Sequence, residues 1–113
     1  ILKALGPAEP ARDHGAAPLE AVHTPDYLAF LAAAHAEWVA AGRSGDAAGY
    51  AWPVVRRRSL NLGRIDAKLG RFSYDAATPI AAGTWSAAYW GAQTALTALD
   101  AALAGEAAAF ALC

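Results

Sequence analysis

The chain has 113 residues, which is enough for one domain and too few for two. Its formal net charge of −1 argues against general electrostatic attraction to nucleic acid or to an anionic membrane. No stretch approaches the roughly 20 continuous apolar residues that span a bilayer, and a single cysteine, Cys113, excludes an internal disulfide and a cysteine-based zinc cluster. We therefore expect a soluble, cytoplasmic protein without a nucleic-acid or membrane partner. Since the chain does not begin with Met and ends on the apolar run AAAFALC, we also expect a fragment of a longer protein.

The first strong helix signal covers residues 24–42. Thr24 can cap a helix whose first position is Pro25, and Gly42 stands where that helix would end. Apolar or weakly polar residues then fall near one face at helical spacing: Tyr27, Leu28, Leu31, His35, Trp38 and Val39. The pattern predicts a helix whose listed face packs into a core.

Residues 43–82 show neither a clean helical period nor a strand period. Glycines and prolines interrupt the segment, which nevertheless contains four aromatic residues: Tyr50, Trp52, Phe72 and Tyr74. A solvated linker would not carry such aromatics, and a long connection inside a compact domain is usually a functional loop or a partner surface. We therefore predict a loop insert over 43–82.

A second strong helix signal covers residues 83–105. Thr84 can cap this helix and Gly105 can end it. Its apolar residues alternate at spacings of four and three, which predicts one apolar stripe: Trp85, Tyr89, Ala92, Leu96, Leu99 and Leu103. Residues 107–113 (AAAFALC) then predict a buried strand.

The side chains suited to catalysis or metal binding form no recognisable motif. The histidines lack metal-ligand spacing. We expect His14 to be solvated in a polar loop, His23 to have a structural role before the helix cap, and His35 to pack in its helix. Cys113 lies in an apolar segment with no base nearby in the sequence, so it is expected to behave as a small hydrophobic residue. These residues predict no catalytic group and no metal ligand within the chain.

Charged residues within the insert offer two further candidates. The basic run VVRRRS, residues 54–59, could bind phosphate or RNA. Because the chain is nearly neutral and contains no nucleic-acid-binding motif, a solvated or partner-facing loop is favoured instead. Asp66 and Asp75 lie among the aromatic residues, where a carboxylate can hold an ammonium group or accept substrate N–H bonds. A surface or turn role is the alternative for both aspartates.

Four stretches, taken in order, resemble the histone deacetylase superfamily and, within it, the bacterial acetylpolyamine amidohydrolases. They are VHTPDYLAFL (22–31), AWPVVRRRS (51–59), GRFSYDAATPIAAGTWSAA (70–88) and GEAAAFALC (105–113). The resemblance implies an α/β arginase/deacetylase-type fold, a parallel sheet flanked by helices. Residues 1–113 would be the N-terminal portion of its single domain, mostly helical with a long loop insert.

The resemblance also implies a zinc-dependent deacetylase as the parent protein. Such enzymes hydrolyse the acetyl amide of acetylated polyamines or similar small amines to acetate and free amine, with zinc polarising the carbonyl and a histidine pair moving protons. In the family those histidines, the zinc ligands and a catalytic tyrosine follow the segment that matches residues 105–113. The chain by itself is therefore expected to bind no catalytic zinc and to be inactive.

Substrate binding and assembly are implied for particular residues. In the family the insert that matches 43–82 helps to form a homodimer and narrows the active-site entrance. Asp75 matches a rim aspartate that binds substrate N–H groups, and Asp66 falls where polyamine-specific relatives can carry an acid that faces the cationic chain. Ala77 departs from a further acid sometimes found there, which weakens the polyamine assignment but not the deacetylase assignment.

Two other functions remain open. The parent enzyme can instead be a deacetylase of acetyl-lysine, as in histone deacetylases, which the alanine at position 77 would favour. The chain can also be a non-catalytic dimerisation or interaction module whose aromatic insert contacts a partner. The sequence leaves the acyl group and the amine undetermined.

Overall fold

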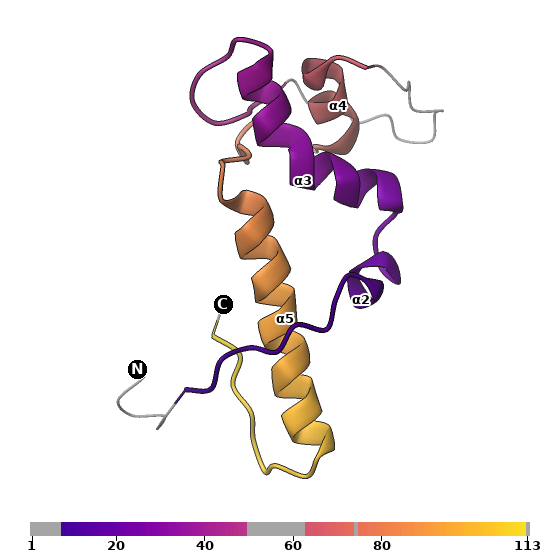
Figure 1. The fold of residues 1–113 in the computed structure, drawn as a ribbon, viewed down its shortest axis with the longest axis vertical. Helices are drawn as coiled ribbons and strands as arrows, with labels where there is room; N and C mark the ends of the chain where they lie inside the picture. The colour runs from indigo at the N-terminus through magenta and orange to yellow at the C-terminus, as the bar shows by residue number, and fades with distance from the viewer. Residues whose placement is uncertain (1–7, 50–62, 74, 113) are drawn as a thin grey trace. The chain divides into compact units, whose positions relative to one another are not determined.

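The computed structural model describes residues 8–49, 63–73 and 75–112 (Figure 1). These residues form the helices α2 (Ala17–Glu20), α3 (Pro25–Ala40), α4 (Ile65–Phe72) and α5 (Thr84–Leu103). The chain divides into two units, one of residues 22–85 and the other of residues 1–21 with 86–113. The second unit is thus built from both ends of the sequence. No helix in the described ranges has the length and apolar character needed to cross a bilayer.

The expectation of a mostly helical chain is confirmed, but the predicted strand at 107–113 is wrong over the residues that the structure describes. Residues 108–112 have no regular secondary structure, and Phe110 and Leu112 are 75% and 45% exposed. An extended segment is stable as a strand only when its backbone groups pair with those of a neighbour. No strand is present in the described ranges to provide that pairing.

Helix α3 has the bounds that its sequence predicts, because its end signals are local. Pro25 occupies the first turn, and Gly42 follows the helix with a φ of 77°, a conformation that favours glycine. Thr24 is the N-cap residue, although its hydroxyl makes no capping hydrogen bond. The interior of the helix contains no glycine or proline to interrupt the turns.

The buried face of α3 differs in part from the predicted one. Phe30, Ala34 and Trp38 are buried, and Tyr27 and Leu31 pack against them half-buried. Val39, which the prediction placed on this face, is 53% exposed. Consecutive helical residues point about 100° apart, so a helix that buries Trp38 directs Val39 towards solvent.

Helix α4 lies inside the segment predicted to be a loop, and the loop prediction is therefore wrong for Ile65–Phe72. Ile65 and Leu69, one helical turn apart, are buried against α3, and the ring of Phe72 stacks on Phe30 with centroids 4.7 Å apart. Eight residues are too few to fold as a helix without tertiary contacts. The packing against α3 provides the stability that the local sequence does not.

The two ends of the 43–82 segment are joined by backbone pairing. Ala47 and Ile80 exchange two N–H···O=C hydrogen bonds of 2.9 Å each, and both residues are buried. Just beyond, Gly49 passes close to α4: a Cβ at this position would lie 2.6 Å from the Cβ of Leu69. Only glycine permits the backbone to approach the helix so closely.

Helix α5 ends before Gly105, which has a φ of 101° as expected for a terminating glycine. The predicted apolar stripe is not buried at its C-terminal end, since Leu99 and Leu103 are 52% and 77% exposed. The one buried side chain among its described residues is the polar Gln93. The N-terminal segment of residues 8–15 crosses α5 at this polar face (Figure 1).

Candidate functional site

Asp66 lies in the first turn of α4, at the edge of an open hollow of about 410 Å³. Its Oδ2 accepts hydrogen bonds from the guanidinium groups of Arg43, at 2.8 Å, and Arg64, at 2.9 Å. The Arg43 guanidinium also lies over the ring of Trp38, 4.7 Å from its centroid. A carboxylate paired with two arginines carries no excess negative charge for a cation, so this geometry fits an ion-pair role better than polyamine binding. The substrate role of Asp66 stays a prediction.

Asp75 has a different environment, exposed and directly before a bend of the backbone at residues 76–78. Its Oδ1 accepts the backbone N–H groups of Ala77, at 2.7 Å, and of Thr78, at 2.8 Å, while the Thr78 hydroxyl donates to Oδ2 at 3.2 Å. These hydrogen bonds, that of Ala77 first, lower the pKa of Asp75 below its ordinary value. The carboxylate is thus ionised and held in one orientation, and no ion pair with it occurs in the described part of the chain.

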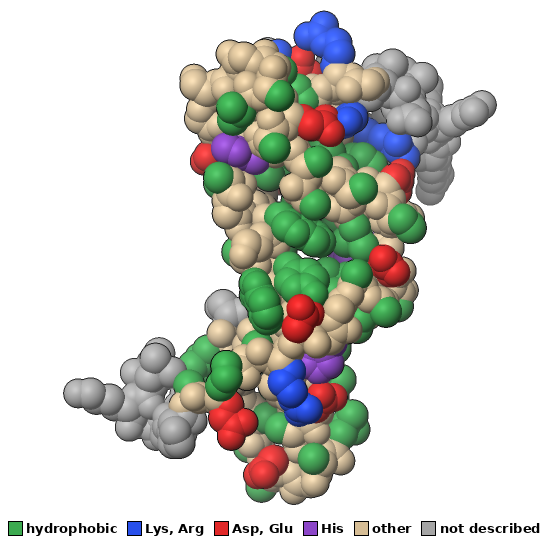
Figure 2. Space-filling model, viewed as in Figure 1, with side chains coloured by type: hydrophobic (Ala, Val, Ile, Leu, Met, Phe, Trp, Pro, Cys, Tyr) green, Lys and Arg blue, Asp and Glu red, His purple; other side chains and the backbone are tan. Residues whose placement is uncertain are grey.

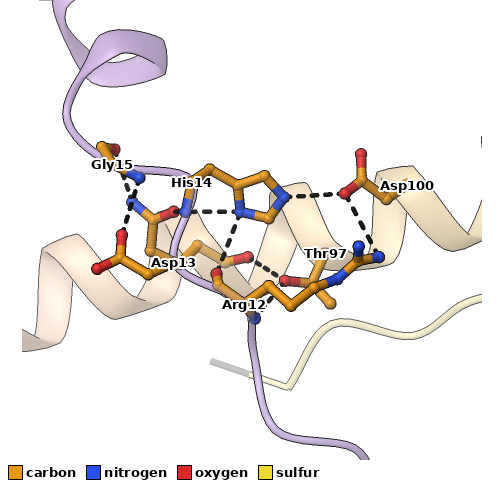
Figure 3. A network of polar contacts seen from close by, with 7 residues as sticks. Arg12, Asp13, His14, Gly15, Thr97 and Asp100 are labelled. Atoms are coloured by element: carbon orange, nitrogen blue, oxygen red, sulfur yellow. Dashed lines mark hydrogen bonds and ion pairs between the residues drawn. The ribbon is translucent and has the colours of Figure 1, made fainter.

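A second cluster of polar side chains, which the sequence did not predict, joins residues 12–15 to helix α5 (Figure 3). Gln93 is at its centre and is completely buried. Its Oε1 accepts the backbone N–H of His14 at 2.7 Å, and its Nε2 donates to the carbonyl of Gly15 at 3.2 Å. The Thr97 hydroxyl, one turn further along α5, accepts the backbone N–H of Arg12 at 2.9 Å. Side chains of α5 thus provide hydrogen-bond partners for backbone N–H and C=O groups of residues 12–15, which have no regular secondary structure.

The imidazole of His14 extends this cluster to Asp100. Its Nε2 lies 2.9 Å from Asp100 Oδ2, and its Nδ1 lies 3.1 Å from the carbonyl oxygen of Arg12 and 3.2 Å from Gln93 Oε1. The hydrogen bond to Asp100 is the main cause that raises the pKa of His14 above its ordinary 6.5. The same bond lowers the pKa of Asp100. The prediction that His14 is solvated is wrong, because only 21% of its side chain is exposed.

Asp13 and Tyr89 complete the cluster on its other side. The Tyr89 hydroxyl donates to Asp13 Oδ1, which also accepts the backbone N–H of Gly15 at 2.8 Å. The hydrogen bond from Tyr89 is the largest cause of a lowered pKa of Asp13, and it raises the pKa of Tyr89 in turn. We call the seven residues Arg12, Asp13, His14, Tyr89, Gln93, Thr97 and Asp100 the His14 cluster.

The other sequence candidates give no site. In the described ranges, no group of three or more His, Cys, Asp or Glu side chains is placed to hold a metal ion. His23 lies against Tyr27, with ring centroids 5.3 Å apart, and His35 is half-buried on α3 as predicted. The basic run 54–59 and Cys113 lie outside the described residues. On the face shown in Figure 2, acidic and basic side chains lie beside one another.

Nothing local in the sequence identifies the His14 cluster. The partners of His14 in α5 are 79 and 86 residues away along the chain. The signal available was the polar series Gln93, Thr97 and Asp100, which falls along one side of a helix otherwise rich in alanine and leucine. Such a series indicates a polar neighbour but does not say which segment supplies it.

The comparisons with known proteins point to one group of enzymes. No protein-family model matches the chain. Acetylpolyamine amidohydrolase 2 of Pseudomonas aeruginosa is 39% identical over 109 residues, which are 96% of this chain and 32% of that protein. Acetylpolyamine amidohydrolase 1 of the same organism is 41% identical over 111 residues, again 96% of this chain and 32% of the relative. The acetylpolyamine amidohydrolase of Mycoplana ramosa is 38% identical over 104 residues.

The fold agrees with a solved structure of the same kind. The crystal structure of an acetylpolyamine aminohydrolase from Burkholderia pseudomallei superposes with a TM-score of 0.83 at 37% identity, covering 98% of this chain and 32% of that one. The chain therefore spans about a third of the length of each relative that it matches. The mostly helical fold of the described residues therefore matches the corresponding third of the Burkholderia pseudomallei enzyme.

Proposed function

We propose that the chain is part of an enzyme that hydrolyses the acetyl amide of acetylated polyamines or similar small amines. The premise is that nearly the whole chain is similar to about one third of the length of the acetylpolyamine amidohydrolases that it matches. The observation that carries the proposal is the agreement of sequence and fold over the same residues: 39–41% identity with the Pseudomonas relatives and a TM-score of 0.83. The products would be acetate and the free amine.

The proposed fold and metal belong to the whole enzyme. We propose that residues 1–113 are the N-terminal portion of a single α/β deacetylase domain with a parallel sheet flanked by helices. Zinc would activate water and polarise the acetyl carbonyl. The resemblance implies zinc ligands that follow the segment matching residues 105–113, and we propose this location for them. Among the described residues, no group of three or more His, Cys, Asp or Glu side chains is placed to hold a metal ion.

A chimera tests the proposed function. The chain would replace its homologous third in the Burkholderia pseudomallei enzyme, and hydrolysis of an acetylated polyamine and of an acetyl-lysine peptide would be measured. We expect the purified chimera to retain metal and to hydrolyse the acetylated polyamine within about tenfold of the parent kcat/KM, because one third of the domain is exchanged for a homologue with the same fold. A folded, metal-loaded chimera that hydrolyses only the peptide would refute the polyamine assignment.

Asp75 is the better-supported of the two proposed substrate contacts, because it is exposed, ionised and fixed by its turn. Replacing Asp75 by asparagine in the chimera preserves an oxygen for the turn but removes the charge. We expect kcat/KM for the acetylated polyamine to fall about tenfold to a hundredfold, the effect of losing a hydrogen bond to a charged group. Asp66→Asn tests the second proposed contact. Glu20→Gln gives the control, because it removes an exposed carboxylate outside the 43–82 segment. An Asp75→Asn chimera with unchanged kcat/KM would remove Asp75 from the substrate site.

Assembly and location follow from the same resemblance. We propose that the 43–82 segment contributes to a homodimer and to the substrate entrance. In support, α4 and the Ala47–Ile80 pairing hold the described ends of this segment in a fixed structure against α3. We also propose a cytoplasmic location. Sedimentation of the chimera, with and without residues 50–62 shortened to a glycine linker, would measure the contribution of the segment to dimerisation.

A further inference from the structure

The protonation of His14 can be worked out from the hydrogen bonds of its neighbours. Gln93 has only one possible orientation: its amide oxygen must face the N–H of His14, and its amide nitrogen must face the carbonyl of Gly15. The hydrogen-bond partners of His14 Nδ1 are therefore two acceptors, the carbonyl oxygen of Arg12 at 3.1 Å and the amide oxygen of Gln93 at 3.2 Å. Nδ1 satisfies this environment only when it carries a proton.

The other ring nitrogen has the same requirement. His14 Nε2 lies 2.9 Å from the Asp100 carboxylate, which also accepts the Arg12 guanidinium at 3.5 Å. A neutral imidazole has one N–H and one lone pair. Whichever nitrogen carries the proton, the lone pair of the other would face an oxygen acceptor at hydrogen-bond distance. The observed arrangement is thus complementary to the imidazolium ion and to neither neutral tautomer.

From this geometry we propose that His14 is a proton-operated clamp, which holds residues 8–15 against α5 when it is protonated and releases them when it loses its proton. The clamp is a conformational device distinct from the proposed deacetylase activity and does not depend on it. In the clamped state, the backbone N–H groups of Arg12 and His14 donate hydrogen bonds to Thr97 Oγ1 and Gln93 Oε1, and release would break both bonds.

Among the titratable residues around this site, His14 is the one whose ordinary pKa lies near neutral pH. Asp100 faces it from α5, while Arg12 and Asp13 flank it on its own segment, with Tyr89 of α5 bonded to Asp13. The pKa values of Asp13 and Asp100 are lowered from 3.8, and that of Tyr89 is raised from 10.0. These groups keep one protonation state between about pH 5 and pH 9.

The direction of the pH effect follows from linkage. The pKa of His14 is higher in the clamped state than the ordinary 6.5 of the released state. The stabilisation is therefore complete below pH 6.5 and is lost as the pH rises through the raised pKa. Between those two pKa values, the equilibrium constant for release increases by at most about tenfold per pH unit, the effect of one linked proton.

Amide hydrogen exchange followed by NMR over pH 5–9 tests the proposal on the 113-residue chain. The Arg12 and His14 amides report on the clamp, and the Ile80 amide, bonded to Ala47, is the reference in the other unit. After correction for the intrinsic rates, we expect protection of the two clamp amides to fall above pH 6.5 while that of Ile80 does not follow. A titration of the His14 ring signal gives its pKa in the same sample.

An Asp100→Asn variant separates the clamp from simple packing. Asparagine can donate its amide N–H to the lone pair of neutral His14, so the contact no longer needs a second ring proton. We expect the protection of the Arg12 and His14 amides to become independent of pH, whereas Asp46→Asn leaves the pH dependence unchanged. Protection in the unmodified chain that is constant from pH 5 to pH 9, or a His14 pKa of 6.5 or below, would overturn the proposal whether or not the variant folds.

Discussion

Replacing Gln93 by leucine is expected to destabilise the contact between residues 8–15 and α5 by about 2–4 kcal/mol. Leucine has a similar size but cannot accept the N–H of His14 or donate to the carbonyl of Gly15. A backbone group that is fully buried costs about 1–3 kcal/mol when it loses its partner. Gln93 is completely buried, but its two hydrogen bonds to the backbone are only part-buried, so the expected loss lies in the lower part of the summed range. The free energy of unfolding in urea, together with exchange of the His14 amide, measures the effect.

The neighbouring position on α5 supplies a control for the Gln93 substitution. The Thr94 hydroxyl donates to the carbonyl of Trp90 in its own helix, so Thr94→Val removes a polar group without affecting residues 8–15. We expect a change within about 0.5 kcal/mol, as for substitutions away from buried features. If both variants were equally stable, the amide of Gln93 would not be what attaches the N-terminal segment.

Truncating Leu69 to alanine is expected to destabilise the unit of residues 22–85 by about 2–5 kcal/mol. Leu69 is 1% exposed and belongs to the core that α3 and α4 share. The loss combines the transfer energy of the deleted atoms with the cost of the cavity that remains. Because α4 is too short to persist without this packing, we expect its helical signal in circular dichroism to be lost at lower urea concentration than in the unmodified chain.

Val39→Ala provides the corresponding aliphatic truncation on the surface of the same unit. Val39 is 53% exposed in the last turn of α3, so its removal leaves no cavity and is expected to change stability by about 0.5 kcal/mol or less. A Leu69→Ala variant that unfolds at the same urea concentration as Val39→Ala would show that α4 does not depend on the shared core.

The sequence by itself determined the features whose causes lie within a few residues of one another. Helices α3 and α5 have nearly the predicted bounds, because Pro25, Gly42 and Gly105 act on the backbone locally. The resemblance of short stretches to acetylpolyamine amidohydrolases was confirmed by relatives that are 39% and 41% identical over 96% of the chain.

The tertiary structure decided the features that depend on distant partners. Helix α4 forms because Leu69 and Phe72 pack against residues of α3. Residues 108–112 form no strand because an extended backbone is stabilised by pairing with another strand, and the described residues contain none. His14 looked like a solvated loop residue, yet its environment is built by Gln93 and Asp100 from the other end of the sequence. The local sequence around His14 does not predict such a contact, since a hydrogen bond stabilises the chain only when both partners are close, and these partners come together only on folding.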